Sequence, residues 1–191
     1  HSLVSGKRWD LVFNICEGMY GVAREAQVPA LLDAYRIPYV FSDPLVMALT
    51  LNKALTKKLI RYHGIPTADF IVAERTSDID NLNLPFPLFA KPVAEGTGKG
   101  ISSKSIIRSR LQLKAVVSSL LEQYEQPVLI ETYLPGREFT VGIVGTGSEA
   151  RVVGVMEIVV TSRAKEKIYS FHTKENWHGV VEYPMAHGEA Y

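Results

Sequence analysis

Residues 88–100 read LFAKPVAEGTGKG, a short apolar run followed by the densest glycine cluster of the chain. Alternation along an extended strand would place Phe89 and Lys91 on one face, opposite Ala90. A lysine near a strand end, followed by a glycine loop, suits phosphate because backbone N–H groups can fold over the phosphate oxygens. The spacing matches neither the Walker A loop nor the dinucleotide fingerprint. On this stretch alone, a hairpin turn with a solvated lysine stays equally open.

Residues 127–144 read PVLIETYLPGREFTVGIV and predict two strands, Pro127 to Glu131 and Glu138 to Val144, joined by a short turn. The exposed backbone of the turn could read the edge of an adenine. The Glu138 carboxylate could accept hydrogen bonds from ribose hydroxyls, as acidic side chains do in other nucleotide sites. Two ordinary surface carboxylates are the alternative that the stretch leaves open.

A third feature is the lysine pair in TLNKALTKKL, residues 50–59. The sequence predicts one helix from Asp43-Pro44, with Asp43 as the N-cap, to His63, where Gly64 ends it. Lys53 and Lys57 would lie one turn apart on this helix, where two cations repel each other unless an anion lies nearby. A solvated helix face is the alternative explanation.

The remaining pattern predicts an α/β fold. Residues 9–15 read WDLVFNI, which is typical of a strand covered on both faces in a parallel sheet, and a helix over 23–35 should follow it. A short strand over 69–73, an amphipathic helix over 109–124 and a strand over 151–160 are also expected. The segment after Thr161 carries no period that predicts structure.

Composition excludes several classes of partner. The 21 Lys and Arg nearly balance the 20 Asp and Glu, so no overall field draws in nucleic acid or an anionic membrane. No apolar run approaches the roughly 20 residues that span a bilayer. A single cysteine, Cys16, allows no internal disulfide and favours a reducing compartment, so we expect a cytoplasmic protein. Because the chain starts without Met, we expect it to be part of a longer protein.

Together, the three motifs and their order resemble the ATP-grasp ligases, most closely the D-alanine–D-alanine ligases. The resemblance covers about residues 11–174, with FAKPVAEGTGKGIS (89–102) and VLIETYLPGREFTVGI (128–143) the most specific stretches. It implies that Lys53 and Lys91 bind phosphate and that Phe89 forms part of the adenine pocket. It also implies that a loop of Gly96, Thr97 and Gly98 covers the γ-phosphate and assists catalysis by positioning the substrate.

The resemblance assigns further positions. It implies an adenine hinge made by Glu131, Thr132, Tyr133 and Leu134, a ribose-binding acid at Glu138, and a further phosphate lysine, Lys174, on a mobile loop. It implies a two-lobe ATP-grasp fold: a remnant of an N-terminal parallel α/β domain over 1–45, a central lobe over 46–132, and the start of a C-terminal lobe over 133–191.

The reaction implied is ATP-dependent phosphorylation of a carboxylate to an acyl phosphate, which an amine then attacks, with Mg²⁺ neutralising phosphate oxygens. We expect a small amino-acid substrate, with D-alanyl-D-alanine for peptidoglycan as the best single product. The metal-binding Asp, Glu and Asn phrases of the family do not occur before Tyr191. We therefore expect the metal ligands in a missing C-terminal part and expect this stretch alone to be inactive. The sequence leaves open whether the protein forms a homodimer.

Departures from the family pattern leave two alternatives. Thr97-Gly98-Lys99 stands where the D-alanine ligases usually carry paired serines, and CEGMYG, residues 16–21, replaces their histidine-glycine phrase. Since both lie near the expected substrate, a ligase for another amino acid or amine is the first alternative. A nucleotide-binding module without turnover is the second.

Overall fold

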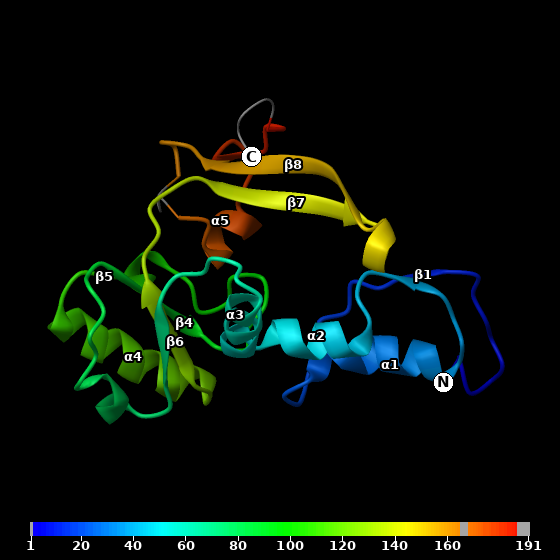
Figure 1. Cartoon of the computed structure of the whole chain (residues 1–191), viewed down its shortest axis with the longest axis horizontal. Helices are drawn as coiled ribbons and strands as arrows, with labels where there is room; N and C mark the ends of the chain where they lie inside the picture. Colours follow the sequence, from blue (N-terminus) through cyan, green and yellow to red (C-terminus); the bar gives the residue numbers. More distant parts are fainter. Residues whose placement is uncertain (1, 165–167, 187–191) are drawn as a thin grey trace.

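The computed structural model describes residues 2–164 and 168–186. In Figure 1 these residues form a sheet with its helix at the lower left, a long hairpin above, and a chain of helices that leads to the N-terminal strands on the right. The hydrogen-bonded strands fall into sheets of two, four and three members. This arrangement confirms the predicted mixture of α-helices and β-strands.

The four-stranded sheet has the order β3-β6-β4-β5 and is antiparallel throughout. Its members are β3 (Phe70–Ala73), β4 (Leu88–Pro92), β5 (Ile106–Ile107) and β6 (Val128–Thr132). In β4, buried residues alternate with half-buried ones, so Leu88 and Ala90 face the core while Phe89 and Lys91 face the other way. The predicted alternation is confirmed.

Helix α4 (Arg110–Tyr124) covers the core face of this sheet. Its N-cap is Ser109, whose side chain accepts a hydrogen bond from the Gln112 N–H group. Leu113, Val117 and Leu120 lie on the buried stripe of the helix and join the sheet residues in the main hydrophobic cluster. The amphipathic helix predicted over 109–124 is confirmed. A 3-10 helix, η2 (Thr76–Ile79), lies in the connection between β3 and β4.

The helix predicted from Asp43 to His63 is two helices, α2 (Pro44–Leu51) and α3 (Lys53–Tyr62). Asp43 caps α2 as expected. The break lies at Asn52, whose side chain accepts from the Leu55 N–H group and thereby caps α3. Asn competes for nearby backbone donors, which favours caps over helix interiors. The break lets the Lys53 N–H group donate to the Val93 carbonyl, 3.0 Å away, so that α3 docks at the end of β4.

The N-terminal part is less covered than predicted. Strands β1 (Val12–Phe13) and β2 (Tyr39–Val40) pair in parallel, and α1 (Gln27–Ala34), preceded by the 3-10 helix η1 (Arg24–Ala26), connects them. The parallel pairing is confirmed. The expectation of a strand covered on both faces is wrong for the described chain, because Phe13 of β1 is 68% exposed and Ile15, just beyond the strand, is 77% exposed.

The last sheet is built on the hairpin of β7 (Glu138–Val144) and β8 (Arg151–Val160), with the 3-10 helix η4 (Gly147–Glu149) in the connection. The predicted hairpin is confirmed. Beyond Thr161 the structure adds a short helix, α5 (Phe171–Glu175), and β9 (Val181–Glu182), which pairs with β8. No helix within residues 2–164 and 168–186 is long and apolar enough to cross a membrane.

Candidate functional site

A cavity of about 640 Å³ opens between the four-stranded sheet and the hairpin of β7 and β8, on the face of the sheet that carries Phe89 and Lys91. We call this side of the sheet its cavity face. Its walls come from α3, β4, β6, the segment 132–138 and β8, so distant parts of the chain meet there. The predicted binding residues that line this first cavity are Phe89, Lys91, Glu131, Thr132, Tyr133, Leu134 and Glu138.

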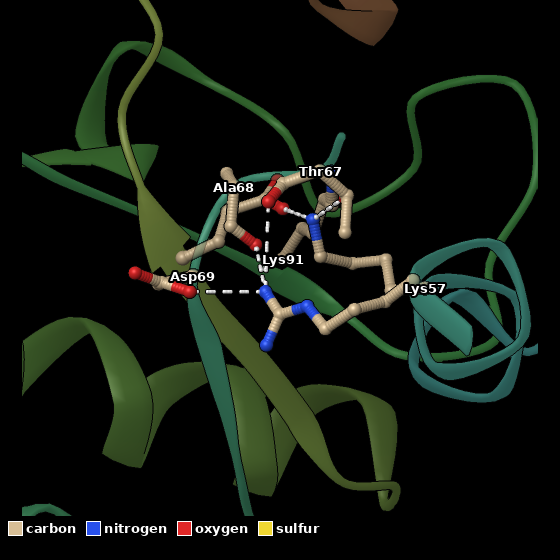
Figure 2. A network of polar contacts seen from close by, with 7 residues as sticks. Lys57, Thr67, Ala68, Asp69 and Lys91 are labelled. Carbon is tan, nitrogen blue, oxygen red and sulfur yellow. Dashed lines mark hydrogen bonds and ion pairs between the residues drawn. The ribbon is translucent and has the colours of Figure 1, made fainter. Parts of the chain in front are cut away.

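Two lysines hold one carboxylate at the floor of the first cavity. The Nζ atom of Lys91 lies 2.6 Å from Oε1 of Glu131, and the Nζ atom of Lys57 lies 2.7 Å from Oε2. Lys57 also donates a hydrogen bond to the Thr67 hydroxyl at 2.6 Å. Figure 2 shows Lys57 reaching from α3 toward Thr67 in the segment before β3. Lys57 was expected beside Lys53 on one helix face but was not among the predicted site residues.

The position of Glu131 follows from strand register. Glu131 lies opposite Phe89 of β4 and Phe70 of β3. Its side chain is 13% exposed. Burial acts to raise the pKa of the Glu131 carboxyl, but the charges and hydrogen bonds of Lys91 and Lys57 outweigh it, so the pKa lies below its ordinary value. The carboxylate is therefore charged at neutral pH and keeps both ammonium groups at the cavity floor.

One wall of the first cavity is aromatic. The rings of Phe89 and Tyr133 lie nearly parallel, with 6.1 Å between centroids and 17° between planes. The Lys91 Nζ atom lies 5.6 Å from the Phe89 centroid, within the range of a cation–π contact. Flat apolar surface beside fixed cations is suited to a planar base that carries phosphates.

The hinge backbone is partly engaged already. The Thr132 N–H group donates to the Asp69 carbonyl at 3.0 Å, and the Tyr133 N–H group donates to the Pro87 carbonyl at 3.1 Å. These two donors fix the segment against the neighbouring strands. A base that hydrogen-bonds to residues 131–134 would therefore have to use backbone groups other than these two N–H groups.

Glu138 opens onto the same cavity as Lys91. Its side chain is exposed to solvent at the start of β7. Partial desolvation nevertheless raises the pKa of its carboxyl, while the charges of Lys174 and Lys91 act in the opposite direction. The acid is therefore positioned to accept hydrogen bonds from a polar ligand that approaches the hairpin.

Lys53 does not line the first cavity. Its Nζ atom donates to the carbonyl oxygen of Glu95 and lies 3.5 Å from that of Val93. The pKa of Lys53 is lowered to about 8, chiefly by burial and also by the charges of Lys91 and Arg24, while Glu95 and Glu25 act to raise it. Lys53 therefore holds the segment that leads into the glycine loop.

The predicted loop residues Gly96, Thr97 and Gly98 also lie outside the wall of the first cavity. Thr97 has φ 51° and Gly98 has φ 83°, so the loop makes a left-handed turn that glycine tolerates best. A Cβ atom at Gly96 would lie 3.5 Å from carboxylate oxygens of Glu17 and Glu25. The loop thus packs toward the N-terminal segment.

Lys174 approaches the first cavity without lining it. Its Nζ atom lies 4.7 Å from the ring centroid of Tyr169, and Tyr169 is part of the cavity wall. Desolvation raises the pKa of Tyr169 to about 12, helped by the hydrogen-bonded Tyr183 hydroxyl at 2.9 Å. The phenol is neutral at ordinary pH.

The hairpin side of the first cavity carries an ion pair that was not predicted from the sequence. The Arg137 guanidinium binds both carboxylate oxygens of Glu157, at 2.8 and 2.7 Å. Both residues line the first cavity. The two residues are 20 positions apart and become neighbours only when β7 pairs with β8, so no local spacing could reveal them.

The described residues contain no group of three or more His, Cys, Asp or Glu side chains arranged to hold a metal ion. Among the acids that line the first cavity, Glu131 is paired with two lysines and Glu157 with Arg137. The described residues therefore form no Mg²⁺ site by themselves.

The model of the D-ala D-ala ligase C-terminus family matches residues 59–187. A D-alanine–D-alanine ligase of Aquifex aeolicus is 32% identical over 181 residues, which cover 94% of this chain and 57% of that protein. The chain spans about half the length of such curated relatives, from 46% to 57%.

Solved structures of similar proteins have the same fold. The VanG D-Ala:D-Ser ligase of Enterococcus faecalis superposes with a TM-score of 0.69 at 25% identity, covering 95% of this chain and 51% of that one. The D-alanine–D-alanine ligase of Bacillus anthracis in complex with ATP gives a TM-score of 0.68 at 23% identity, covering 99% and 57%. The ATP-grasp fold expected from the sequence is confirmed.

Proposed function

The chain belongs to the D-alanine–D-alanine ligase family, and from this membership we propose that its first cavity binds ATP for the ligation of a carboxylate to an amine. ADP and phosphate are the other products. D-Alanyl-D-alanine for peptidoglycan is the product we propose, made in the cytoplasm. The ATP complex of the Bacillus anthracis relative supports the choice of nucleotide.

One observation carries the proposal. Lys91 of the four-stranded sheet and Glu138 of the hairpin line a single cavity, and the hinge, residues 131–134, lies between them. A triphosphate needs cations, and a base needs a flat apolar wall with polar groups at its edge. The first cavity supplies both within about 640 Å³, which is within the usual range for small-molecule sites.

We assign the roles as follows. Lys91 and Lys57 stabilise phosphate charge, and Glu131 keeps their ammonium groups fixed before the nucleotide arrives. Phe89 and Tyr133 hold the base, and Glu138 accepts from the ribose. Preorganised charges need no rearrangement when negative charge develops on the transferred phosphoryl group.

The remaining assigned residues would act after a rearrangement. Lys53, Lys174 and the loop of Gly96, Thr97 and Gly98 lie outside the wall of the cavity. We propose that they approach the phosphates when the loop and α5 close over the nucleotide, since an acyl phosphate must be kept from water. Mg²⁺, when bound, would neutralise phosphate oxygens, with its main ligands outside residues 2–186.

The domain division into 1–45, 46–132 and 133–191 belongs to the same proposal, as does a homodimer.

The first alternative function is ligation of a different amino acid or amine. It is favoured by Thr97-Gly98-Lys99 in the loop and by the D-Ser acceptor named for the Enterococcus faecalis relative. Phosphate release measured on the full-length protein against a panel of amino acids separates the two: a response to D-alanine supports our choice, and a response only to another amine rejects it.

Calorimetric titration with ATP tests nucleotide binding directly. We expect Lys91→Ala to weaken ATP about 10- to 100-fold, because a charge-assisted hydrogen bond contributes about 1.5–3 kcal/mol. Its free energy of unfolding should fall by no more than about 1 kcal/mol, because Lys57 still pairs with Glu131. The matched control is Lys58→Ala, which removes an exposed lysine of α3 outside the cavity and should leave the affinity unchanged. Equal affinities for Lys91→Ala and the parent protein would reject the assignment.

A further inference from the structure

A second cavity, of about 610 Å³, lies between the glycine loop and α4. Its walls are the loop and the 3-10 helix η3 (Ser103–Ser105), one face of α4, and His172 of α5. Ile101 lines both cavities, so the end of the glycine loop is their shared wall. None of the roles proposed above uses this second cavity.

The two cavities differ in charge. The lining of the first cavity has three acids (Glu131, Glu138, Glu157) and three bases (Lys57, Lys91, Arg137). The lining of the second has Lys99, Lys104 and the imidazole of His172, and no Asp or Glu belongs to it. A wall with cations and no carboxylate favours an anionic occupant.

The floor of the second cavity is apolar. Val116, Leu120 and Tyr124 of α4 contribute it, and Ser119 is also part of the lining. An occupant that gains from this floor must carry an apolar body beside its charge. Inorganic phosphate alone would meet the cations but not the floor.

The part of the wall over residues 100–105 is held in place before any ligand binds, whereas His172 would move with α5 in the closure proposed above. A Cβ atom at Gly100, whose φ is 78°, would lie 2.5 Å from Pro92 and 3.3 Å from Tyr124, so the loop packs closely against β4 and α4. Ser105 is 2% exposed, and its Oγ atom accepts from the Ser102 N–H group at 3.2 Å. A fixed wall reduces the entropy that binding costs.

We propose that the second cavity is a binding site for a small anion with an apolar body, of the class of aromatic carboxylates and phosphate monoesters. Lys99 and Lys104 bind the anionic group, and the α4 floor packs against the ring. The site is distinct from the first cavity and does not rest on the proposed ligase function.

Titration calorimetry with benzoate, phenyl phosphate and the neutral benzamide tests the proposal on the purified protein. We expect saturable binding of at least one of the two anions and at least about tenfold weaker binding of benzamide. Benzoate binding without phenyl phosphate binding assigns a carboxylate, and the reverse assigns a phosphate. Failure of both anions to saturate, or equal affinity for benzamide, overturns the proposal.

Matched variants locate the binding. Lys104→Ala should weaken the anion about fivefold, the upper range for one partly exposed ion pair, whereas Lys114→Ala, on the exposed side of α4, should not. Ser119→Phe should fill the cavity and abolish binding, while Ser118→Phe, outside the lining, should not. Equal affinities within either pair overturn the site.

Lys91→Ala separates this site from the first cavity. Because Lys91 does not line the second cavity, the variant should bind the anion as the parent protein does. Loss of anion binding in Lys91→Ala would mean that the anion occupies the first cavity, and that result rejects the second site. Loss of ATP binding with retained anion binding leaves both proposals standing.

Discussion

The two faces of the four-stranded sheet differ in what they contact: one packs against α4 in the core, and the other lines the first cavity. On the face toward α4, Leu88, Ala90 and Ile130 are 0% exposed and form the main hydrophobic cluster. On the other face, Lys91 and Glu131 form a half-buried ion pair at the floor of the first cavity. Alternation along β4 and β6 therefore places the main core on one face and the charged binding groups on the other. A substitution on the core face should lower stability while leaving the binding groups in place, whereas the charged groups of the cavity face contribute to stability through their ion pair.

The largest expected effect comes from the core face. Ile130→Ala should lower the free energy of unfolding by about 2–5 kcal/mol, because it leaves a cavity in a closely packed cluster. ATP affinity should persist under conditions in which the variant is folded. Urea unfolding measures the first effect and calorimetry the second.

Leu111→Ala is the control for that experiment. Leu111 lies on α4 and is 83% exposed, so its truncation should change stability by less than about 0.5 kcal/mol. A loss for Ile130→Ala no larger than that of the control would contradict the separation of the two faces.

Glu131→Gln tests the cavity face. The change leaves Lys57 and Lys91 without their shared carboxylate, and we expect a loss of about 1–3 kcal/mol at neutral pH, between the values for exposed and fully buried pairs. The folded-state pKa of Glu131 lies below its ordinary value of 4.5. Its stabilisation is therefore present above pH 4.5 and is lost as the pH falls through the lowered pKa.

Urea unfolding of the parent protein and Glu131→Gln across this range measures the difference. The two free energies should converge on acidification. A difference that stays constant with pH would mean that the ionised carboxylate contributes nothing to the fold.

The smallest expected effect belongs to Lys53, where α3 meets the end of β4. The unfolded chain keeps the Lys53 proton up to about pH 10.5, whereas the folded chain releases it near pH 8. Burial of the charged form thus opposes folding below pH 8, and stability should rise between these values. Relative to Lys53→Met, the parent protein should gain about 1 kcal/mol over this window after allowance for solvent screening. Parallel pH dependences of the two proteins would contradict this explanation.

Local patterns predicted most of the fold. The alternation in 88–92, the helix over 109–124 and the Asp43 cap depend on neighbours in sequence, and the structure has all three. The break at Asn52 was missed because the apolar spacing continues across it. Exposure of Phe13 was missed because a strand's own sequence does not say what packs against it.

The candidate site was predictable where one strand or turn carries it. Phe89, Lys91 and the hinge came from two contiguous stretches, and all of them line the first cavity. Lys57 and Arg137 could not be selected in this way. Each becomes part of the site through a partner distant in sequence, Glu131 for Lys57 and Glu157 for Arg137.

A crystal structure with a non-hydrolysable ATP analogue tests the central claim most directly. Our account predicts the base against Phe89 and Tyr133, the ribose at Glu138 and the phosphates within hydrogen-bonding distance of Lys91. An analogue bound outside the first cavity, or one whose phosphates lie away from Lys91 while the protein keeps this fold, would contradict the account.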